Sequence, residues 1–169
     1  MRTRLEAALN KRWYGGVQPG LVLRCVSIFY AAIIRLRTGL YRAGLLKSQK
    51  IPVPVIVVGN FTVGGTGKTP FTIALVQAMR AQGWKPGVVS RGYGRKTRSP
   101  VDVKADTLAD DCGDEPLLIF QRTHSAIRVD SNRVRAAEYL VAQGCNLIIA
   151  DDGLQHLALQ RDIEIELLD

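Results

Sequence analysis

Cysteine and histidine are scarce in this chain of 169 residues, which contains three cysteines and two histidines. Cys25, Cys112 and Cys145 stand far apart, and none belongs to a CxxC pair of the kind that binds zinc or carries out redox chemistry. This shortage excludes a disulfide-stapled scaffold and favours a reducing compartment. We therefore interpret the three cysteines as structural or neutral residues and expect no zinc knuckle.

Long apolar runs are missing as well. Within the helical pattern of residues 21–46, the longest uncharged run covers residues 25–34, whereas a membrane span needs roughly 20 residues. A single Arg24 would cost only roughly 3 kcal/mol at the centre of a span, so a spanning helix stays open as an alternative. Internal repeats, low-complexity segments and the pattern of a secretory signal peptide are also missing.

Acidic residues are rare at the amino-terminal end, where Glu6 is the single acid among the first 50 residues. The whole chain has a formal net charge of +8 at pH 7, and a basic segment suits an anionic partner such as lipid or nucleic acid. On a helix, Arg24, Arg35 and Arg42 would fall within about 20° of one another, beside an apolar stripe. We predict a basic amphipathic helix lying in a membrane interface, with a helix packed on the protein's own core as the alternative.

A glycine-rich segment is the most informative feature present. The apolar run at residues 53–58 predicts a buried parallel strand, and residues 68–79 predict a helix with Phe71, Leu75 and Met79 on its core side. Glycines between them would let backbone N–H groups converge on a polyphosphate, and the helix amino terminus adds a positive end. We predict a phosphate-binding loop whose cofactor-binding residues are Thr62, Val63, Gly64, Gly65, Thr66, Gly67, Lys68 and Thr69.

Two positions of this loop depart from known patterns. Thr62 stands where GxxxxGK[ST] has glycine, and Val63 stands where a second class of phosphate loops carries lysine. The second departure argues against that class. In either case Lys68 would supply a point charge to the β- and γ-phosphates of a nucleotide, and the Thr69 hydroxyl would be a ligand for Mg²⁺.

Two further motifs follow predicted strands. A strand at residues 85–90 runs into the basic loop SRGYGR, and Arg91 and Arg95 would lie near the carboxyl end of the sheet, where ligands bind in open α/β folds. A solvated loop is the alternative. The strand at residues 146–150 ends in Asp151 and Asp152, the carboxylate partner that a phosphate loop needs for Mg²⁺. His156 could orient this pair or touch the nucleotide, or be a plain loop residue.

The remaining pattern predicts strands at residues 101–104, 126–129 and 162–168, and helices at residues 115–122 and 132–143. Asp130 or Ser131 would cap the second helix. The fold class is then α/β and P-loop NTPase-like: a mostly parallel sheet flanked by helices, preceded by an amphipathic segment. We divide the chain into residues 1–50, the membrane-associated segment, and residues 51–169, the P-loop domain.

Four motifs together resemble one known family. In chain order they are VGNFTVGGTGKTP, SRGYGR, GDEP and DDGLQH. Their order and spacing resemble the tetraacyldisaccharide 4′-kinases of lipid A biosynthesis, from about Arg12 to the last residue. The resemblance implies transfer of the γ-phosphate of ATP to the 4′-hydroxyl of a membrane-bound acylated glucosamine disaccharide 1-phosphate. It also implies Mg²⁺, no nucleic acid, and a peripheral location on the cytoplasmic face of the bacterial inner membrane.

The resemblance also implies roles for single residues. Asp114 in GDEP would be the general base for the sugar hydroxyl, with Asp152 as the alternative base and helix capping as the alternative role of Asp114. The metal candidates are Thr69, Glu115 and Asp151. Arg91 and Arg95 would bind the anomeric phosphate of the lipid or ATP.

The length of the chain departs from this family. Its members carry a second α/β half, which includes a histidine expected to pair with the catalytic aspartate, so we expect this chain to be the front part of a longer enzyme. Two other classes of function stay open. One is a membrane-associated P-loop ATPase acting as a switch, and the other is a nucleotide-binding fragment without enzymatic activity.

Overall fold

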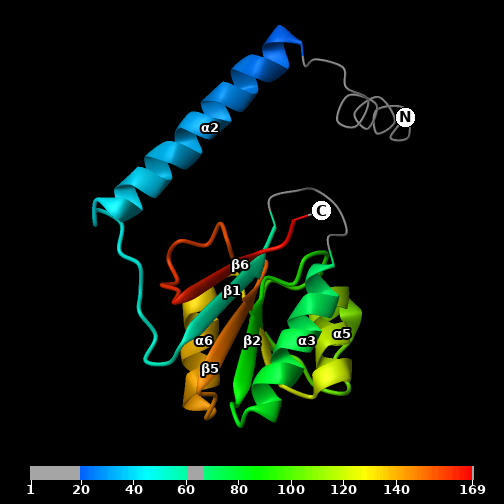
Figure 1. The fold of residues 1–169 in the computed structure, drawn as a ribbon. Helices are drawn as coiled ribbons and strands as arrows, with labels where there is room; N and C mark the ends of the chain where they lie inside the picture. The colour runs from blue at the N-terminus through cyan, green and yellow to red at the C-terminus, as the bar shows by residue number, and fades with distance from the viewer. Residues whose placement is uncertain (1–19, 61–66, 169) are drawn as a thin grey trace, which may run out of the picture. The chain divides into compact units, whose positions relative to one another are not determined.

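The computed structural model describes residues 20–60 and 67–168 of the chain. The chain divides into two compact units, Met1–Leu46 and Lys47–Asp169, which are described separately below. The described part of the first unit is dominated by one helix, and the second unit is an α/β domain (Figure 1).

The helix of the first unit is α2 (Leu21–Arg42), which is 22 residues long. None of its residues is buried, and large apolar side chains such as Val26 and Phe29 are 59% and 69% exposed. Near its end, the guanidinium of Arg37 lies 5.8 Å from the centroid of the Tyr41 ring. Within residues 20–60 and 67–168, no helix combines the length and the hydrophobicity that crossing a bilayer requires.

The second unit contains a sheet of six strands among the described residues, in the order β3-β4-β2-β5-β1-β6. Neighbouring strands run parallel except for β3, which pairs antiparallel with β4 at one edge. The prediction of a mostly parallel sheet is confirmed. The strands are β1 (Val55–Gly59), β2 (Pro86–Ser90), β3 (Val101–Asp102), β4 (Ala126–Val129), β5 (Leu147–Asp151) and β6 (Ile163–Glu166).

Helices cover both faces of this sheet (Figure 1). On one face lie α3 (Lys68–Ala81) and α5 (Asp114–Thr123), whose apolar residues share a core with β1, β2 and β4. On the other face lies α6 (Arg133–Ala142). A short helix, α4 (Ala109–Cys112), precedes α5. Because both faces are covered, every residue of β1, β2 and β5 is buried, which explains the apolar runs of β1 and β5.

The register of the central strands sets the position of the site. Val58 of β1 pairs with Asp151 of β5, and Val89 of β2 pairs with Ala150 of β5. The carboxyl ends of these three parallel strands therefore meet at one edge of the sheet. This is the edge at which open α/β folds bind ligands.

The buried face of α3 lies one residue away from the predicted one. Thr72 and Val76 are its fully buried residues, whereas Phe71, Leu75 and Met79 are partly buried against the same core. The shift arises because the Thr72 hydroxyl donates a hydrogen bond to Asp151 of β5, so this polar residue takes a buried place.

Both predicted helix caps are wrong. Helix α5 begins at Asp114 itself, after Gly113 with φ 95°, and no side chain caps it. Helix α6 is capped by Asn132, whose Oδ1 accepts hydrogen bonds from the backbone N–H groups of Val134 and Arg135 at 3.1 and 3.2 Å. Asp130 and Ser131 lie before this cap. Asparagine has the same capping ability as aspartate, so sequence preference alone does not choose between them.

Candidate functional site

Lys68 stands at the centre of the site, as the first residue of α3. Gly67 precedes it in a left-handed conformation with φ 73°, which glycine adopts without steric cost. Residues 61–66 lie outside the described part of the chain, so the predicted contacts of Thr62, Val63, Gly64, Gly65 and Thr66 cannot be followed in the structure. The described Gly67, Lys68 and Thr69 form the start of α3.

The Lys68 ammonium joins two strand ends. Its Nζ lies 2.6 Å from Oδ1 of Asn60, the residue after β1, and 3.3 Å from Oδ1 of Asp152, the residue after β5. The Lys68 side chain is 20% exposed and that of Asp152 is 62% exposed. A lysine held between two oxygens at a helix amino terminus is placed to bind an anionic group. Sequence reasoning missed Asn60, although its place directly after the phosphate-loop strand was a usable signal.

Asp151 is a buried carboxylate at the end of β5. It is 2% exposed, and its Oδ1 accepts a hydrogen bond of 3.2 Å from the hydroxyl of Thr72. Burial, followed by the negative charges of Glu115 and Asp152, raises the pKa of Asp151 to about 6, against the opposing effects of Thr72 and Arg133. A nearby cation would stabilise the charged form of such a carboxylate, because it offsets both the cost of burial and the repulsion from the like charges.

Glu115 and Asp114 lie exposed in the first turn of α5. The negative charge of Glu115 raises the pKa of Asp151, so the two carboxylates repel each other electrostatically at this edge of the sheet. Among residues 20–60 and 67–168, no three acidic, histidine or cysteine side chains gather into a metal cluster. The predicted set of Thr69, Glu115 and Asp151 has only two such groups, and hard oxygen ligands of this number suit Mg²⁺ when phosphates and water complete its shell.

The turn after β5 has an unusual backbone and a buried partner. Asp152 adopts φ 53°, in the left-handed region. Arg133, the first residue of α6, is 5% exposed, and its Nη2 donates to the carbonyl oxygens of Asp151 and Asp152 at 3.2 and 3.0 Å. Burial lowers the pKa of Arg133, while the two aspartates oppose that effect. Nothing in the sequence marked Arg133 as more than a residue of a predicted helix.

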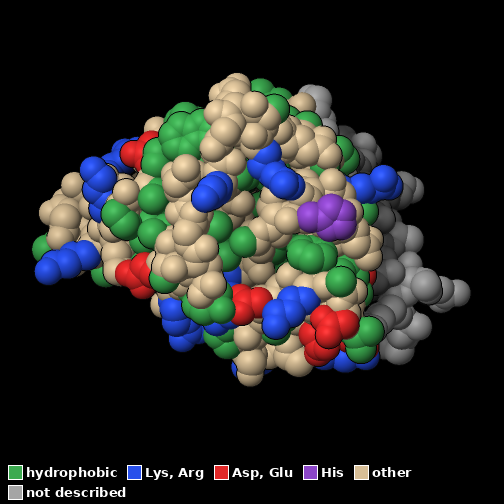
Figure 2. Space-filling view, turned by 90° about the horizontal axis from the view of Figure 1, so that it is seen from below, with side chains coloured by type: hydrophobic (Ala, Val, Ile, Leu, Met, Phe, Trp, Pro, Cys, Tyr) green, Lys and Arg blue, Asp and Glu red, His purple; other side chains and the backbone are tan. Residues whose placement is uncertain are grey.

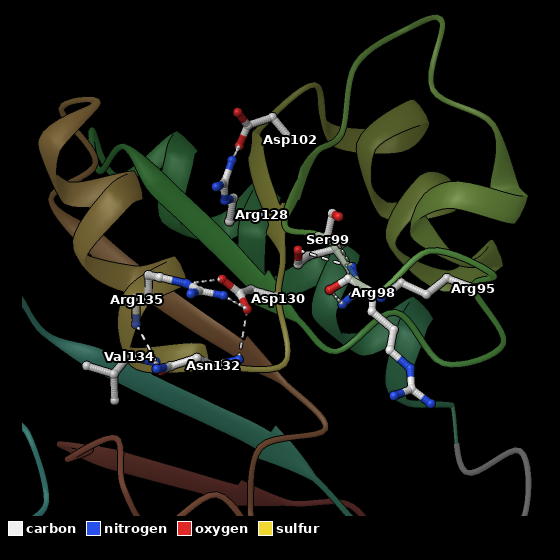
Figure 3. A network of polar contacts seen from close by, with 10 residues as sticks. Arg95, Arg98, Ser99, Asp102, Arg128, Asp130, Asn132, Val134 and Arg135 are labelled. Atoms are coloured by element: carbon white, nitrogen blue, oxygen red, sulfur yellow. Dashed lines mark hydrogen bonds and ion pairs between the residues drawn. The ribbon is translucent and has the colours of Figure 1, made fainter.

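The basic loop after β2 surrounds a pocket of about 660 Å³, lined by Arg91, Gly92, Tyr93, Gly94, Arg95, Thr97, Arg98 and Ser131. Arg91 is exposed at this pocket. The guanidinium of Arg95 instead donates to carbonyl oxygens of Ser99, Val129 and Arg98, at 2.9, 3.4 and 3.5 Å (Figure 3). Arg95 therefore shapes the loop, whereas Arg91 faces the space inside it.

Gly92 fixes this loop against the sheet. It has φ 69°, and a Cβ at this position would lie 2.5 Å from the carbonyl oxygen of Cys112. Gly113 is packed in the same way, because its Cβ would lie 2.9 Å from the carbonyl oxygen of Tyr93. These close backbone contacts bring the basic loop beside the start of α5, which carries Asp114.

An ion pair between a buried aspartate and an exposed arginine supports the pocket from the side of α6. Asp130 is fully buried, and its two oxygens accept hydrogen bonds of 2.8 Å from Nε and Nη2 of Arg135 (Figure 3). Burial raises the pKa of Asp130, but the bonds from Arg135 and from the Asn132 N–H outweigh it, so the pKa lies below its ordinary value. The pair fixes the turn that contributes Ser131 to the pocket.

His156 lies in the turn that follows the aspartates, where its backbone N–H donates to the carbonyl oxygen of Gly153 at 2.9 Å.

The opposite end of the sheet is less concentrated in charge. In Figure 2, which views the molecule from that side, basic and acidic side chains lie interspersed on the described part of the face. A second pocket there, of about 420 Å³, is lined by residues 50–54 and Asp162. Asp162 uses a carboxylate oxygen to accept the N–H of Val55 at 2.8 Å.

Comparison with known proteins bears directly on this arrangement. The family model described as tetraacyldisaccharide-1-P 4′-kinase matches residues 20–169. This chain belongs to that family. The match includes the described part of the site, from Lys68 and Asp114 to the aspartates after β5. The family predicted from the four motifs is confirmed.

Members of the tetraacyldisaccharide 4′-kinase family align with most of the chain. It is 53% identical over 158 residues to the tetraacyldisaccharide 4′-kinase of Stenotrophomonas maltophilia, covering 93% of this chain and 47% of the relative. It is 51% identical over 163 residues to that of Methylobacillus flagellatus, covering 95% of this chain and 49% of the relative. The chain thus spans about half the length of the curated relatives it matches.

A solved member of the family supports the fold. The crystal structure of LpxK from Aquifex aeolicus in complex with ATP matches with a TM-score of 0.80 and 35% identity, covering 87% of this chain and 48% of that one. The predicted fold class is therefore confirmed by a structure as well as by the topology described above. The predicted roles of single residues stay predictions.

Proposed function

We propose that this chain supplies the ATP-binding half of a tetraacyldisaccharide 4′-kinase of lipid A biosynthesis. The enzyme would transfer the γ-phosphate of ATP to the 4′-hydroxyl of a tetraacyl glucosamine disaccharide 1-phosphate. The observation that carries the proposal is the position of Lys68, held by Asn60 and Asp152 at the amino terminus of α3. The family match and the likeness to an ATP complex support it.

In the transfer, the 4′-oxygen of the sugar attacks the γ-phosphorus while the bond from that phosphorus to the β–γ bridging oxygen breaks and ADP leaves. A sugar hydroxyl is a poor nucleophile near neutral pH, so a positioned carboxylate that takes its proton is needed. Asp114 suits this role because it is exposed and its neighbour Gly113 packs against the basic loop. Asp152 is the alternative base, but its hydrogen bond with Lys68 favours a role in holding the lysine.

Mg²⁺ would be held by Thr69, Glu115 and Asp151, directly or through water. When bound, it would neutralise charge on the β- and γ-phosphates. The raised pKa of Asp151 supports this assignment, since it reports a buried carboxylate that lacks sufficient positive charge nearby.

Arg91 would bind the anomeric phosphate of the lipid or a phosphate of ATP, because it is exposed at the pocket of the basic loop. Arg95 would contribute by shaping that loop through its carbonyl contacts. His156 would orient the side chains of Asp151 and Asp152 or contact the nucleotide.

Helix α2 would lie in the interface of the cytoplasmic leaflet of the bacterial inner membrane, as a peripheral anchor that brings the enzyme to its lipid substrate. Its exposed apolar side chains and its basic residues support this placement. Packing of α2 on another part of the protein is the alternative.

Phosphorylation of tetraacyldisaccharide 1-phosphate with γ-labelled ATP tests the proposal. The assay uses the 169-residue chain alone and the same chain joined to the second half of the Stenotrophomonas maltophilia relative. We expect label in the lipid from the joined protein. ATP hydrolysis without labelled lipid would favour an ATPase switch, and ATP binding without either reaction would favour a non-enzymatic nucleotide-binding fragment.

A further inference from the structure

Arg133 is a buried cation for which neither the family motifs nor the proposed chemistry gives a role. It is 5% exposed at the first residue of α6. A guanidinium taken out of water is costly unless its donors find acceptors and its charge finds opposite charges. The groups that Arg133 contacts therefore indicate its role.

The guanidinium of Arg133 donates hydrogen bonds to two consecutive carbonyl groups of the turn that leaves β5. Its Nη2 lies 3.2 Å from the carbonyl oxygen of Asp151 and 3.0 Å from that of Asp152. Asp152 has φ 53°, and it is one of two non-glycine residues with positive φ among those described. Such a conformation persists only where surrounding contacts hold it.

The sheet holds the other side of the same turn. The N–H of Gly153 donates to the carbonyl oxygen of Val58 at 3.2 Å. A Cβ on Gly153 would lie 3.0 Å from Cγ1 of Val57 and 3.1 Å from Cβ of Ala150, so the turn fits closely onto β1 and β5. Arg133 from α6 and the backbone of β1 thus hold the turn between them.

The conformation of this turn sets the position of the Asp152 carboxylate. It lies 3.3 Å from Nζ of Lys68, on the edge that α3 shares with β1 and β5. We propose that Arg133 is a positioning residue, which holds the turn of Asp151 and Asp152 so that the Asp152 carboxylate stays on Lys68. Its effect reaches the nucleotide through Asp152 and Lys68, without contact of its own, and only this last step rests on the proposed function.

Arg135 offers a matched control in the same turn of α6. It is an exposed arginine whose partner is the carboxylate of Asp130, on the side of the basic loop, rather than the carbonyl groups of the aspartate turn. Replacement of either arginine by methionine removes a charge and its hydrogen bonds at the start of α6. Only the replacement of Arg133 should affect the aspartate turn.

The first measurement needs no ligand. Amide hydrogen exchange of Gly153 is followed by NMR in the 169-residue chain, its Arg133→Met variant and its Arg135→Met variant. Loss of two hydrogen bonds to the turn should speed exchange at Gly153 about tenfold in Arg133→Met, and Arg135→Met should leave it nearly unchanged. Unchanged exchange in a folded Arg133→Met variant would overturn the proposal.

A second variant keeps this test decisive if Arg133→Met fails to fold. Arg133→Lys retains the charge but replaces the planar guanidinium, whose Nη2 donates to both carbonyl oxygens, by a compact ammonium on a flexible stem. We expect faster exchange at Gly153 with a nearly unchanged melting temperature. Exchange equal to that of the unmodified chain would overturn the proposal in this case.

The second measurement separates positioning from general support of the fold. ATP binding in the presence of Mg²⁺ is titrated in the chain, in Arg133→Met, in Asp152→Ala and in the double variant. Because Arg133 acts through Asp152, its loss should weaken binding about fivefold in the unmodified chain and hardly at all in Asp152→Ala. Equal weakening in both backgrounds would overturn the proposal. If the unmodified chain bound no ATP, the proposed function would be contradicted instead, and the exchange of Gly153 would decide the role of Arg133.

Discussion

Two roles are open to Asp114, general base and helix cap, and the structure bears on the second. It is exposed in the first turn of α5, and the cap position belongs to Gly113, with no side-chain hydrogen bond to the turn. Capping therefore does not explain an aspartate at this place. If Asp114 takes the proton of the sugar hydroxyl, Asp114→Asn should lower turnover by roughly 10²–10⁴ while ATP affinity and melting temperature change little. Lipid phosphorylation by the joined protein, with ATP titration and thermal unfolding, measures all three.

Asp110 provides the control for that substitution. It lies in α4 on the surface, where it pairs with Lys96 at 2.5 Å. Asp110→Asn should leave turnover unchanged. Near-normal turnover in Asp114→Asn would move the base role to Asp152, and weakened ATP binding together with slow turnover would place Asp114 on the metal.

Asp151 makes a prediction about pH and stability in the absence of Mg²⁺. Its pKa is raised from 3.8 to about 6 in the folded protein, first by burial and then by Glu115. The folded state then binds the proton more tightly than the unfolded state, so its stability falls as pH rises through this window. The loss should reach about 2–3 kcal/mol by pH 7 relative to Asp151→Asn, measured by denaturant unfolding across the range.

Asp130 should change the stability of the folded protein with pH in the opposite direction. Its pKa is lowered in the folded protein, because the hydrogen bonds from Arg135 and Asn132 outweigh its burial. Its stabilising effect is present above the ordinary pKa of 3.8 and is lost as pH falls through the lowered value. The two variants Asp130→Asn and Asp151→Asn therefore control each other, and slopes of the same sign would contradict the account of Asp151.

Some site residues could be predicted from the sequence and others could not. Lys68 and Asp151 follow from local patterns, a glycine-rich loop before a helix and an apolar strand that ends in aspartate. Thr72 and Arg133 reach Asp151 from other elements, α3 and α6. Their roles depend on which strands are neighbours and in what register, which no local pattern records.

At the level of elements, burial explains which predictions succeeded. The strands β1, β2 and β5 are buried at every residue, and the valine and isoleucine runs of β1 and β5 marked these two in the sequence. β4 was also found, with the bounds observed. Helix starts were less predictable, because several residues near the start of α6 have similar capping ability and the choice depends on the bonds made to Asp130.

Helix α2 makes a prediction about location. Removal of residues 1–46 should shift the protein from the membrane fraction to the soluble fraction, and high salt should partly do the same to the intact chain. Attraction to anionic lipid is worth about 1 kcal/mol per basic residue and is screened within a Debye length. Replacement of Arg24, Arg35 and Arg42 by glutamine should reproduce the effect of salt, as measured by vesicle sedimentation. Unchanged sedimentation of the truncated protein would show that α2 packs on protein instead.

For the whole molecule, the order of strands could not be read from the sequence. β5 lies between β1 and β2, although it comes after both in the chain, and this insertion brings the aspartate turn beside Lys68. The buried runs predicted that these strands share a sheet, but long-range pairing of apolar strands has no sequence code of comparable strength. The carboxyl edge that results is where the start of α3, the aspartates and the start of α5 meet.

We infer that this chain binds ATP at that edge through Lys68. Isothermal titration of ATP into the 169-residue chain, in the presence of Mg²⁺, measures this binding, with Lys68→Ala as the site variant. Lys85→Ala is the control, because Lys85 is an exposed lysine just before β2 at the opposite end of the sheet. We predict saturable binding of one ATP by the chain and by Lys85→Ala, and its loss in Lys68→Ala, where the phosphates lose the positive charge at the start of α3. Equal binding by Lys68→Ala, or no saturable binding by the unmodified chain, would contradict the account.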